Sequence, residues 1–236
     1  MLRFLFNILN IFCLVTCILL SGVVLCVSTP QITSSLSNAT CLVDKAKFTR
    51  DQLTYLANTC REFISGECDK TSVYSSVETI NKQSQTTYKD LTQDDFAAVN
   101  DQYSLDINSV SHLSDVAWLI ANIRIAFFLS LTFSIAFSIL LAIFGGFGSL
   151  SRSFKIAALL VLLLILGLVI WSFNDFNGMF NFIHSLFFSK GSWVFSENSL
   201  LICMFPESFW ILMAIICGAI SGLVSIILLI TSKFLR

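Results

Sequence analysis

Two histidines are the residues of this sequence best suited to acid–base chemistry. They are His112 and His184, and the 236 residues contain no others. Asp115 follows His112 by three positions, so on a continuous helix its carboxylate shares a face with the imidazole. A neutral imidazole can act as a general base or donate a hydrogen bond to a developing oxyanion. The alternative for each histidine is an interfacial side chain with an apolar body and a hydrated tip.

Arg124 is the other residue whose position suggests a role, because it lies within an apolar run. A charge inside a membrane span is often functional, but near the start of the run Arg124 can also extend to the outer surface. We therefore interpret it as a structural or lipid-headgroup-binding residue. The sequence has no G-x-S-x-G motif, CxxC pair or His/Cys cluster, so we predict neither a serine nucleophile nor a metal site.

The composition places these residues in a membrane protein. Hydrophobic residues make up 56% of the chain and charged residues only 12%, with a mean hydropathy of +0.81. Soluble domains average about 25% charged residues, so an ordinary cytosolic enzyme is excluded. The net charge of −1 gives no reason to expect a nucleic-acid partner.

Four apolar runs are each long enough to cross a bilayer, for which about 18 or more apolar residues suffice. They predict an all-α membrane protein with four transmembrane helices and an extracellular cap that could include short strands. The predicted parts are the cytoplasmic N-terminus with the first span (1–27), the cap (28–117), the second span (118–148), a cytoplasmic turn (149–155), the third span (156–173), an outer segment (174–208), and the fourth span with the cytoplasmic C-terminus (209–236).

The first run could instead be a signal peptide, since Arg3 precedes it and Ser28-Thr29-Pro30 follows. Its apolar stretch, Phe4–Val27, is longer than the roughly 7–15 residues of a signal peptide, and no A-x-A cleavage site closes it. We therefore expect an uncleaved membrane anchor.

Basic residues in the short flanks set the expected orientation of the spans. Arg3, the turn with Arg152 and Lys155, and the C-terminal Lys233 and Arg236 should share the cytoplasmic side. Both termini are then cytoplasmic, which requires an even number of spans. All fifteen Asp and Glu residues fall on the outer side, in agreement with this arrangement.

The predicted cap contains one clear helix signal, in which Thr49 is the N-cap and Gly66 the stop. The stretch 67–90 has no clear period and could hold a strand around Val73–Ile80 or a loop. Thr92 and Asp95 form a capping-box pattern, which predicts a helix running to about Tyr103. The cap also contains three cysteines, Cys41, Cys60 and Cys68. They allow one disulfide in an oxidising compartment, but the sequence does not indicate its connectivity.

The outer segment 174–208 is rich in aromatic residues. On a helix from Asn174, His184 belongs to an aromatic face with Phe176, Phe180 and Phe187. Tryptophans that flank and follow this helix suit the headgroup level of a bilayer, so we expect the segment to lie along the outer interface. His112 and His184 are then expected at the same membrane face.

Three stretches of the chain resemble the lipoprotein intramolecular transacylase (Lit) family of bacterial membrane proteins. The first is His112-Leu113-Ser114-Asp115-Val116, which lies just before the second span. The second runs from Phe180 to His184 and continues with Phe187, Phe188 and Trp193. The third contains Leu201-Ile202, Phe205-Pro206-Glu207 and Phe209-Trp210. The four-span order and the cap also agree, so the resemblance covers nearly the whole chain.

The sequence also departs from the pattern of that family at several positions. The family has Glu shortly before the first histidine and Lys after Asp-Val, where this chain has Ser109 and Ala117. It favours Asp-Pro and a further Asp after the loop Trp, where this chain has Phe195-Ser196 and Ser199.

The resemblance implies a defined reaction at the bacterial cell membrane. The substrate is a diacylated lipoprotein whose N-terminal cysteine carries an S-diacylglyceryl group and a free α-amine. The sn-2 acyl chain moves to that amine, and no cofactor is needed. His112 and His184 would be catalytic, and Asp115 would orient His112. Membrane lipid is the other expected partner, and the chain is taken as a monomer by default. The residues expected to line the substrate pocket are Phe180, Phe187, Phe188, Trp193, Glu207 and Arg124.

Two non-enzymatic alternatives remain open at the level of sequence. One is a four-span scaffold or receptor whose extracellular cap binds a partner, and it predicts that both histidines tolerate replacement. The other is a transporter or channel, for which intramembrane polar residues are sparse.

Overall fold

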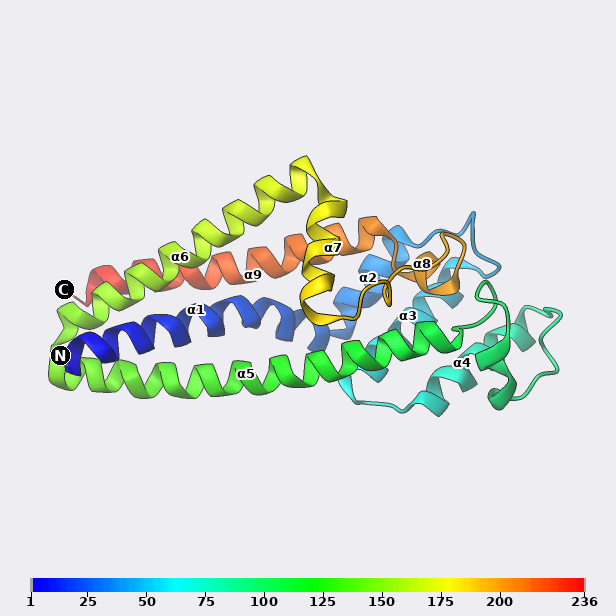
Figure 1. The fold of residues 1–236 in the computed structure, drawn as a ribbon, viewed down its shortest axis with the longest axis horizontal. Coiled ribbons are helices and arrows are strands. Elements are labelled where there is room, and N and C mark those ends of the chain that lie inside the picture. The colour runs from blue at the N-terminus through cyan, green and yellow to red at the C-terminus, as the bar shows by residue number, and fades with distance from the viewer. Residues whose placement is uncertain (1, 236) are drawn as a thin grey trace. The chain divides into compact units, whose positions relative to one another are not determined.

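The computed structural model describes residues 2–235, and every regular element in that range is a helix (Figure 1). Four helices are long and apolar enough to cross a membrane: α1 (Leu2–Ser28), α5 (Ile107–Gly145), α6 (Phe147–Asn174) and α9 (Glu207–Phe234). The shorter elements are α2 (Pro30–Thr40), α3 (Arg50–Ser65), α4 (Lys70–Gln83), the 3-10 helix η1 (Gln93–Ala98), α7 (Phe176–Phe187) and α8 (Leu200–Met204). The predicted all-α fold with four spans is confirmed, and the cap strands that were allowed for do not occur in the described range.

The chain forms two compact units. The helix bundle contains the residues up to Leu25, then Asn122–Phe182, and the residues from Ile215 onward. The cap unit contains Cys26–Ala121 and Ile183–Ala214. Because α5 has 39 residues and rises about 1.5 Å per residue, it is about twice as long as a hydrocarbon core of about 30 Å requires. Its first turns accordingly belong to the cap unit.

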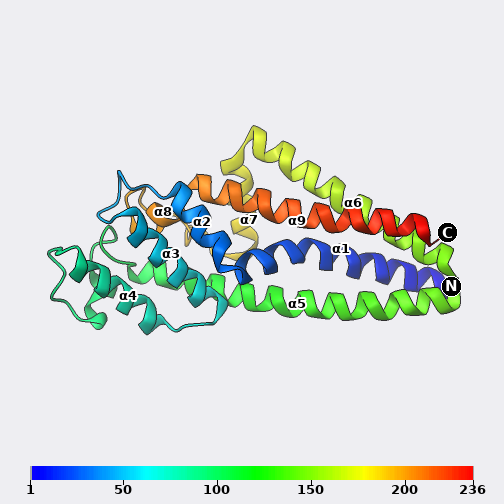
Figure 2. The ribbon, with the colours of Figure 1, turned by 180° about the vertical axis from the view of Figure 1, so that it is seen from behind.

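The start of α1, the α5–α6 turn at Gly146 and the end of α9 lie at the same end of the helix bundle (Figures 1 and 2). This is the arrangement that an even number of spans requires. The basic residues predicted to anchor that end are therefore gathered together, apart from Arg236, which lies outside the described residues. The side of the membrane that this end faces stays a prediction.

Buried polar side chains join the helices of the bundle. Asn10 of α1 is fully buried, donates to the Ser153 hydroxyl at 3.0 Å and accepts a hydrogen bond from the Ser138 hydroxyl at 3.2 Å. Ser221 of α9 donates to the carbonyl of Ile18 on α1 at 3.0 Å. Such bonds hold helices together in an apolar solvent, where the hydrophobic effect no longer drives their association.

Gly22 allows α1 and α9 to approach closely, and this leads to a first prediction. A Cβ atom at this position would lie 2.5 Å from the backbone carbonyl oxygen of Cys217. We therefore expect Gly22→Ala to push α1 and α9 apart and to lower the Tm of the purified protein. Gly218→Ala is the matched control, because a Cβ there meets only the Ile165 side chain, at 3.9 Å. Equal Tm values for the two variants would contradict the close packing.

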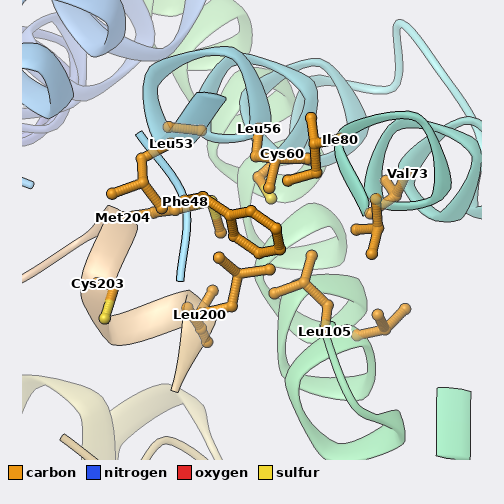
Figure 3. Packing of buried hydrophobic residues seen from close by; sticks show 14 of the residues in the cluster. Phe48, Leu53, Leu56, Cys60, Val73, Ile80, Leu105, Leu200, Cys203 and Met204 are labelled. Atoms are coloured by element: carbon orange, nitrogen blue, oxygen red, sulfur yellow. The ribbon is translucent and has the colours of Figure 1, made fainter. Parts of the chain in front are cut away.

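The cap unit is built around a hydrophobic core to which residues distant in sequence contribute (Figure 3). Phe48 and Leu53 pack with Leu200 and Met204 of α8, which lies near the end of the outer segment 174–208. Backbone hydrogen bonds fix α8 in this place, since the Leu200 N–H donates to the Asp101 carbonyl at 2.7 Å. The outer segment therefore ends inside the cap core rather than at its surface.

The helix predicted between Thr49 and Gly66 is confirmed as α3. The Thr49 hydroxyl accepts a hydrogen bond from the Gln52 N–H, and the Gln52 side chain accepts one from the Thr49 N–H, which completes a capping box. Gly66 ends the helix with a φ of +75°, a left-handed conformation that glycine adopts without steric cost.

The strand or loop expected around Val73–Ile80 is wrong, because this stretch lies within helix α4. Val73, Val77 and Ile80 follow a helical spacing and are all buried in the cap core. Asp69 caps the helix by accepting from the Ser72 N–H at 2.8 Å. This bond and a second one from the Ser72 hydroxyl hold the pKa of Asp69 below its ordinary value.

The capping pair Thr92 and Asp95 is present, but the helix expected to run to about Tyr103 is wrong. The Asp95 carboxylate accepts from both the N–H and the hydroxyl of Thr92, at 3.2 and 2.8 Å. The element that follows is the short η1, which ends at Ala98. Asn100 then forms a turn in which its side-chain oxygen accepts from the Gln102 N–H at 2.8 Å, and such a bond competes with helix continuation.

Candidate active site

His112 lies in the second turn of α5, on the part of the helix that belongs to the cap unit. The helix start is fixed by Asp106, whose carboxylate accepts from the Ser109 N–H at 2.8 Å. Val110 and Leu113, on either side of the histidine, are buried in the cap core. The backbone that carries the His112 imidazole is therefore held by both capping and packing.

His184 lies in the last turn of α7 and is followed by a loop with three aromatic residues. The Phe188 N–H donates to the His184 carbonyl at 2.9 Å, which continues the helical path for one residue. The loop then turns at Gly191, whose carbonyl accepts from the Val194 N–H at 3.2 Å. Trp193 and Phe195 stand on this loop, which connects α7 to α8 (Figure 1).

The two imidazoles lie side by side within the cap unit. Their ring centroids are 6.4 Å apart and their planes are inclined by 28°. The Phe188 ring contacts both of them, at 5.0 Å from His112 and 5.6 Å from His184. Phe195 lies 5.7 Å from His112, and Trp193 lies 5.7 Å from His184. We call His112 and His184 the histidine pair and the three surrounding rings its aromatic wall.

One ring nitrogen of the histidine pair is buried without a partner. Nδ1 of His112 is inaccessible to solvent and makes no hydrogen bond within the described residues. Buried polar atoms are normally hydrogen-bonded, so an unpaired one at a candidate site is a position at which a bound molecule could supply the partner.

Asp115 shares the helix with His112 but makes no hydrogen bond to its imidazole in the described part of the chain. The carboxylate is exposed, one turn further along α5. Its influence on the histidine in this structure is therefore that of a nearby charge rather than of a hydrogen-bonded orienting group. The orienting role stays a prediction.

The remaining predicted pocket residues are distributed over the two units. Phe188 and Trp193 contact the histidine pair, whereas Phe187 is 54% exposed and Glu207 is exposed in the first turn of α9. Phe180 on α7 and Arg124 on α5 belong to the helix bundle.

Phe195 is the site residue that sequence reasoning missed. It appeared only as a departure from the family pattern, yet its ring contacts the His112 imidazole. Two other departures have structural roles, since Ser109 is buried beside the Asp106 cap and Ser199 caps α8 by accepting from the Ile202 N–H at 3.3 Å. The sequence signal for Phe195 was its position two residues after Trp193. This spacing is common in loops, so it does not single out a site residue.

The same residues fall within a known protein family. The model of the family described as "Lipoprotein intramolecular transacylase Lit" matches residues 7–210, which include both histidines and the whole aromatic wall. The chain belongs to the Lit family. A sequence comparison with curated proteins gave no match.

Solved structures of a Lit protein share the fold of this chain. The membrane-integral lipoprotein intramolecular transacylase Lit from Bacillus cereus matches with a TM-score of 0.76 and 16% sequence identity, over 99% of this chain and 95% of that one. Structures of two variants of that protein, with one histidine replaced by arginine or by alanine, match with a TM-score of 0.68 and 15% identity each. They cover 99% of this chain and 92% and 93% of theirs. Since identity is low, these similarities show a common fold.

Proposed function

We propose that this Lit-family protein transfers an acyl chain within a diacylated bacterial lipoprotein. The donor is the sn-2 ester of the S-diacylglyceryl group, and the acceptor is the free α-amine of the same N-terminal cysteine. The products are one amide at the N-terminus and one free sn-2 hydroxyl, so the atoms balance without water, cofactor or second substrate. The histidine pair enclosed by its aromatic wall is the observation that carries this proposal.

The reaction requires a proton to leave the α-ammonium before the amine can attack. The α-amine has an ordinary pKa of about 7.7–8.0, so a neutral imidazole at the site can accept that proton. The amine nitrogen then forms a bond to the sn-2 carbonyl carbon, and negative charge develops on the carbonyl oxygen. The second histidine donates a hydrogen bond to this oxyanion. When the bond to the glyceryl oxygen breaks, a histidine returns a proton to the departing alkoxide.

The separation of 6.4 Å between the ring centroids allows one histidine to act as the base and the other as the oxyanion donor. The two rings face each other, and Nδ1 of His112 makes no hydrogen bond within the described residues. A base and an oxyanion donor must approach the same headgroup from different sides, and two facing rings at this distance allow it. The buried Nδ1 of His112 supports this assignment, because a substrate group could satisfy it.

The aromatic wall supports acyl transfer rather than hydrolysis. Phe188, Phe195 and Trp193 offer no group that would hold an attacking water near His112 and His184, apart from the Trp193 indole N–H. Excluding water protects the ester until the amine reaches it. Holding the amine and the ester of one molecule together can lower the barrier by roughly 7–11 kcal/mol.

The proposal is tested by expressing the full chain in a bacterium whose lipoproteins remain diacylated. The N-terminal lipopeptide of a reporter lipoprotein is then analysed by tandem mass spectrometry. The expected product has unchanged mass, but fragmentation places one acyl chain on the α-nitrogen and leaves one on the glyceryl group. A free α-amine on the reporter, despite folded protein in the membrane, would overturn the proposal and favour the scaffold or receptor alternative.

A further inference from the structure

Two cysteines of the cap unit, Cys41 and Cys203, lie next to each other although they are far apart in the sequence. Cys41 directly follows helix α2, and Cys203 lies within α8. The Leu42 N–H donates to the Cys203 carbonyl at 3.0 Å, so the two backbones are in direct contact beside the thiols. One turn earlier on α2, the Ser37 hydroxyl donates to the Met204 carbonyl at 3.4 Å. Two hydrogen bonds thus fix the register of α2 against α8.

The side chains of Cys41 and Cys203 are both buried in the cap core. Cys41 is 6% exposed, Cys203 is fully buried, and both belong to the cap core shown in Figure 3, where Cys203 is labelled. Burial raises the pKa of the Cys203 thiol, Lys45 opposes this rise, and the neighbouring Cys41 thiol adds to it.

We propose that Cys41 and Cys203 form a disulfide bond when the cap unit matures in an oxidising compartment. The sequence alone suggested three cap cysteines, an odd number. The fold adds Cys26, at the start of the cap unit, and Cys203, which α8 brings into the cap core. Both thiols are free in this structure, and the hydrogen bond between Leu42 and Cys203 places the chain segments that carry them next to each other. A disulfide between them requires Cα atoms about 4.4–6.8 Å apart.

The chemical step is a thiol–disulfide exchange with an external disulfide as oxidant. The Cys41 thiolate attacks the oxidant and forms a mixed disulfide, releasing one thiol. Burial raises the pKa of the Cys41 thiol, and Arg50 Nη1, which lies 3.8 Å from the Cys41 sulfur, opposes part of this rise. The Cys203 thiolate then displaces the second thiol. Two protein thiols and one disulfide give one protein disulfide and two thiols, so electrons and protons balance.

The bond would fasten the end of the segment that carries part of the aromatic wall. Trp193 and Phe195 lie on the loop that leads into α8. A link between α2 and α8 would restrict how far this loop can move away from the cap core. This consequence does not depend on the acyl-transfer proposal, because it concerns only the cap unit.

The test uses the full-length protein in detergent with oxidised glutathione as the oxidant. The exchange is stopped with acid, and the remaining thiols are then blocked with N-ethylmaleimide in denaturant at neutral pH. The unreduced digest is analysed by mass spectrometry. We expect a linked peptide pair containing Cys41 and Cys203, and a rise of several degrees in Tm that dithiothreitol reverses. Recovery of both cysteines as alkylated thiols, or of either one linked to another cysteine, would overturn the proposal.

Matched variants separate this bond from other cysteine chemistry. Cys203→Ser should abolish both the linked peptide and the oxidant-dependent rise in Tm. Cys68→Ser is the control, because the Cys68 sulfur contacts the Thr59 carbonyl at 3.7 Å elsewhere in the cap unit. It should leave both readouts unchanged, and loss of the Cys41–Cys203 link in this variant would also count against the proposal.

Discussion

Replacing either His112 or His184 by alanine is expected to remove N-acylated product from the reporter lipoprotein. Each substitution deletes one member of the histidine pair, whose rings lie 6.4 Å apart. Acid–base catalysis by a positioned side chain contributes roughly 10²–10⁴-fold in rate, so a fall of this size is expected for each variant. The ratio of N-acylated to free-amine lipopeptide, measured at short induction times, reports the change.

Nearby exposed residues provide the controls. The control variants are Ser111→Ala and Leu186→Ala. Ser111 is next to His112 on α5, and Leu186 is two residues after His184 on α7. Both should keep the activity of the parent protein, and all four variants should show similar amounts in the membrane. Retained acyl transfer in either histidine variant would contradict the paired mechanism while leaving membership of the Lit family untouched.

Glutamine variants can assign the two roles. A glutamine side chain donates a hydrogen bond but cannot accept a proton near neutral pH. At the oxyanion position, His→Gln should therefore retain more activity than His→Ala, whereas at the base position both should be inactive. The double variant His112→Ala/His184→Ala is expected to lose little more than the worse single variant, because residues that act as a unit are not additive.

The spans and the best-capped helix were predictable because their signals are local. An apolar run of about 18 or more residues has no other stable structure in a bilayer, so four runs define four helices. Helix α3 carries its own start at Thr49 and its own stop at Gly66. These features depend on neighbours within a few positions, and a single sequence contains them.

Helices α2 and α4 were not predicted because they contain many residues that are not typical of helices. Helix α4 is rich in β-branched and polar residues, and Val73, Val77 and Ile80 suit a strand as well as a helix. Helix α2 is mostly Ser, Thr and Asn, although Pro30 suits its first turn. Packing against the cap core decides both cases, and that core draws on residues from α3 and α8 that no local pattern connects.

The candidate site shows the same division between local and distant information. The sequence predicted His112 and His184 at the same membrane face, but it contained no signal that their rings would lie 6.4 Å apart. Phe195 contacts His112 from a loop whose far end is fixed by the hydrogen bond from the Leu200 N–H to the Asp101 carbonyl, a contact between residues distant in sequence. Contacts set by chain closure over such distances are not encoded in spacing.

Replacing Phe96 by alanine is expected to give the largest loss of stability in the cap unit. Phe96 is fully buried on η1, and removal of a buried phenylalanine ring costs about 3–5 kcal/mol. The same core holds Val110 and Leu113 on either side of His112, so loss of the ring weakens the support of the helix that carries His112. Thermal unfolding of the purified protein in detergent, monitored by circular dichroism and limited proteolysis, measures the effect.

The comparison that isolates burial is with Tyr55→Ala, which removes an aromatic ring that is 50% exposed on α3. Its Tm should fall much less, because about half of the residue is already in contact with solvent and only one side-chain hydrogen bond, to Ser76 at 3.3 Å, is lost. Phe96→Leu should lie between the two, since it fills part of the cavity. If acyl transfer by Phe96→Ala recovers at low temperature, the loss is one of folding, because both histidines are intact. Equal Tm values for Phe96→Ala and Tyr55→Ala would show that the cap core does not hold the site.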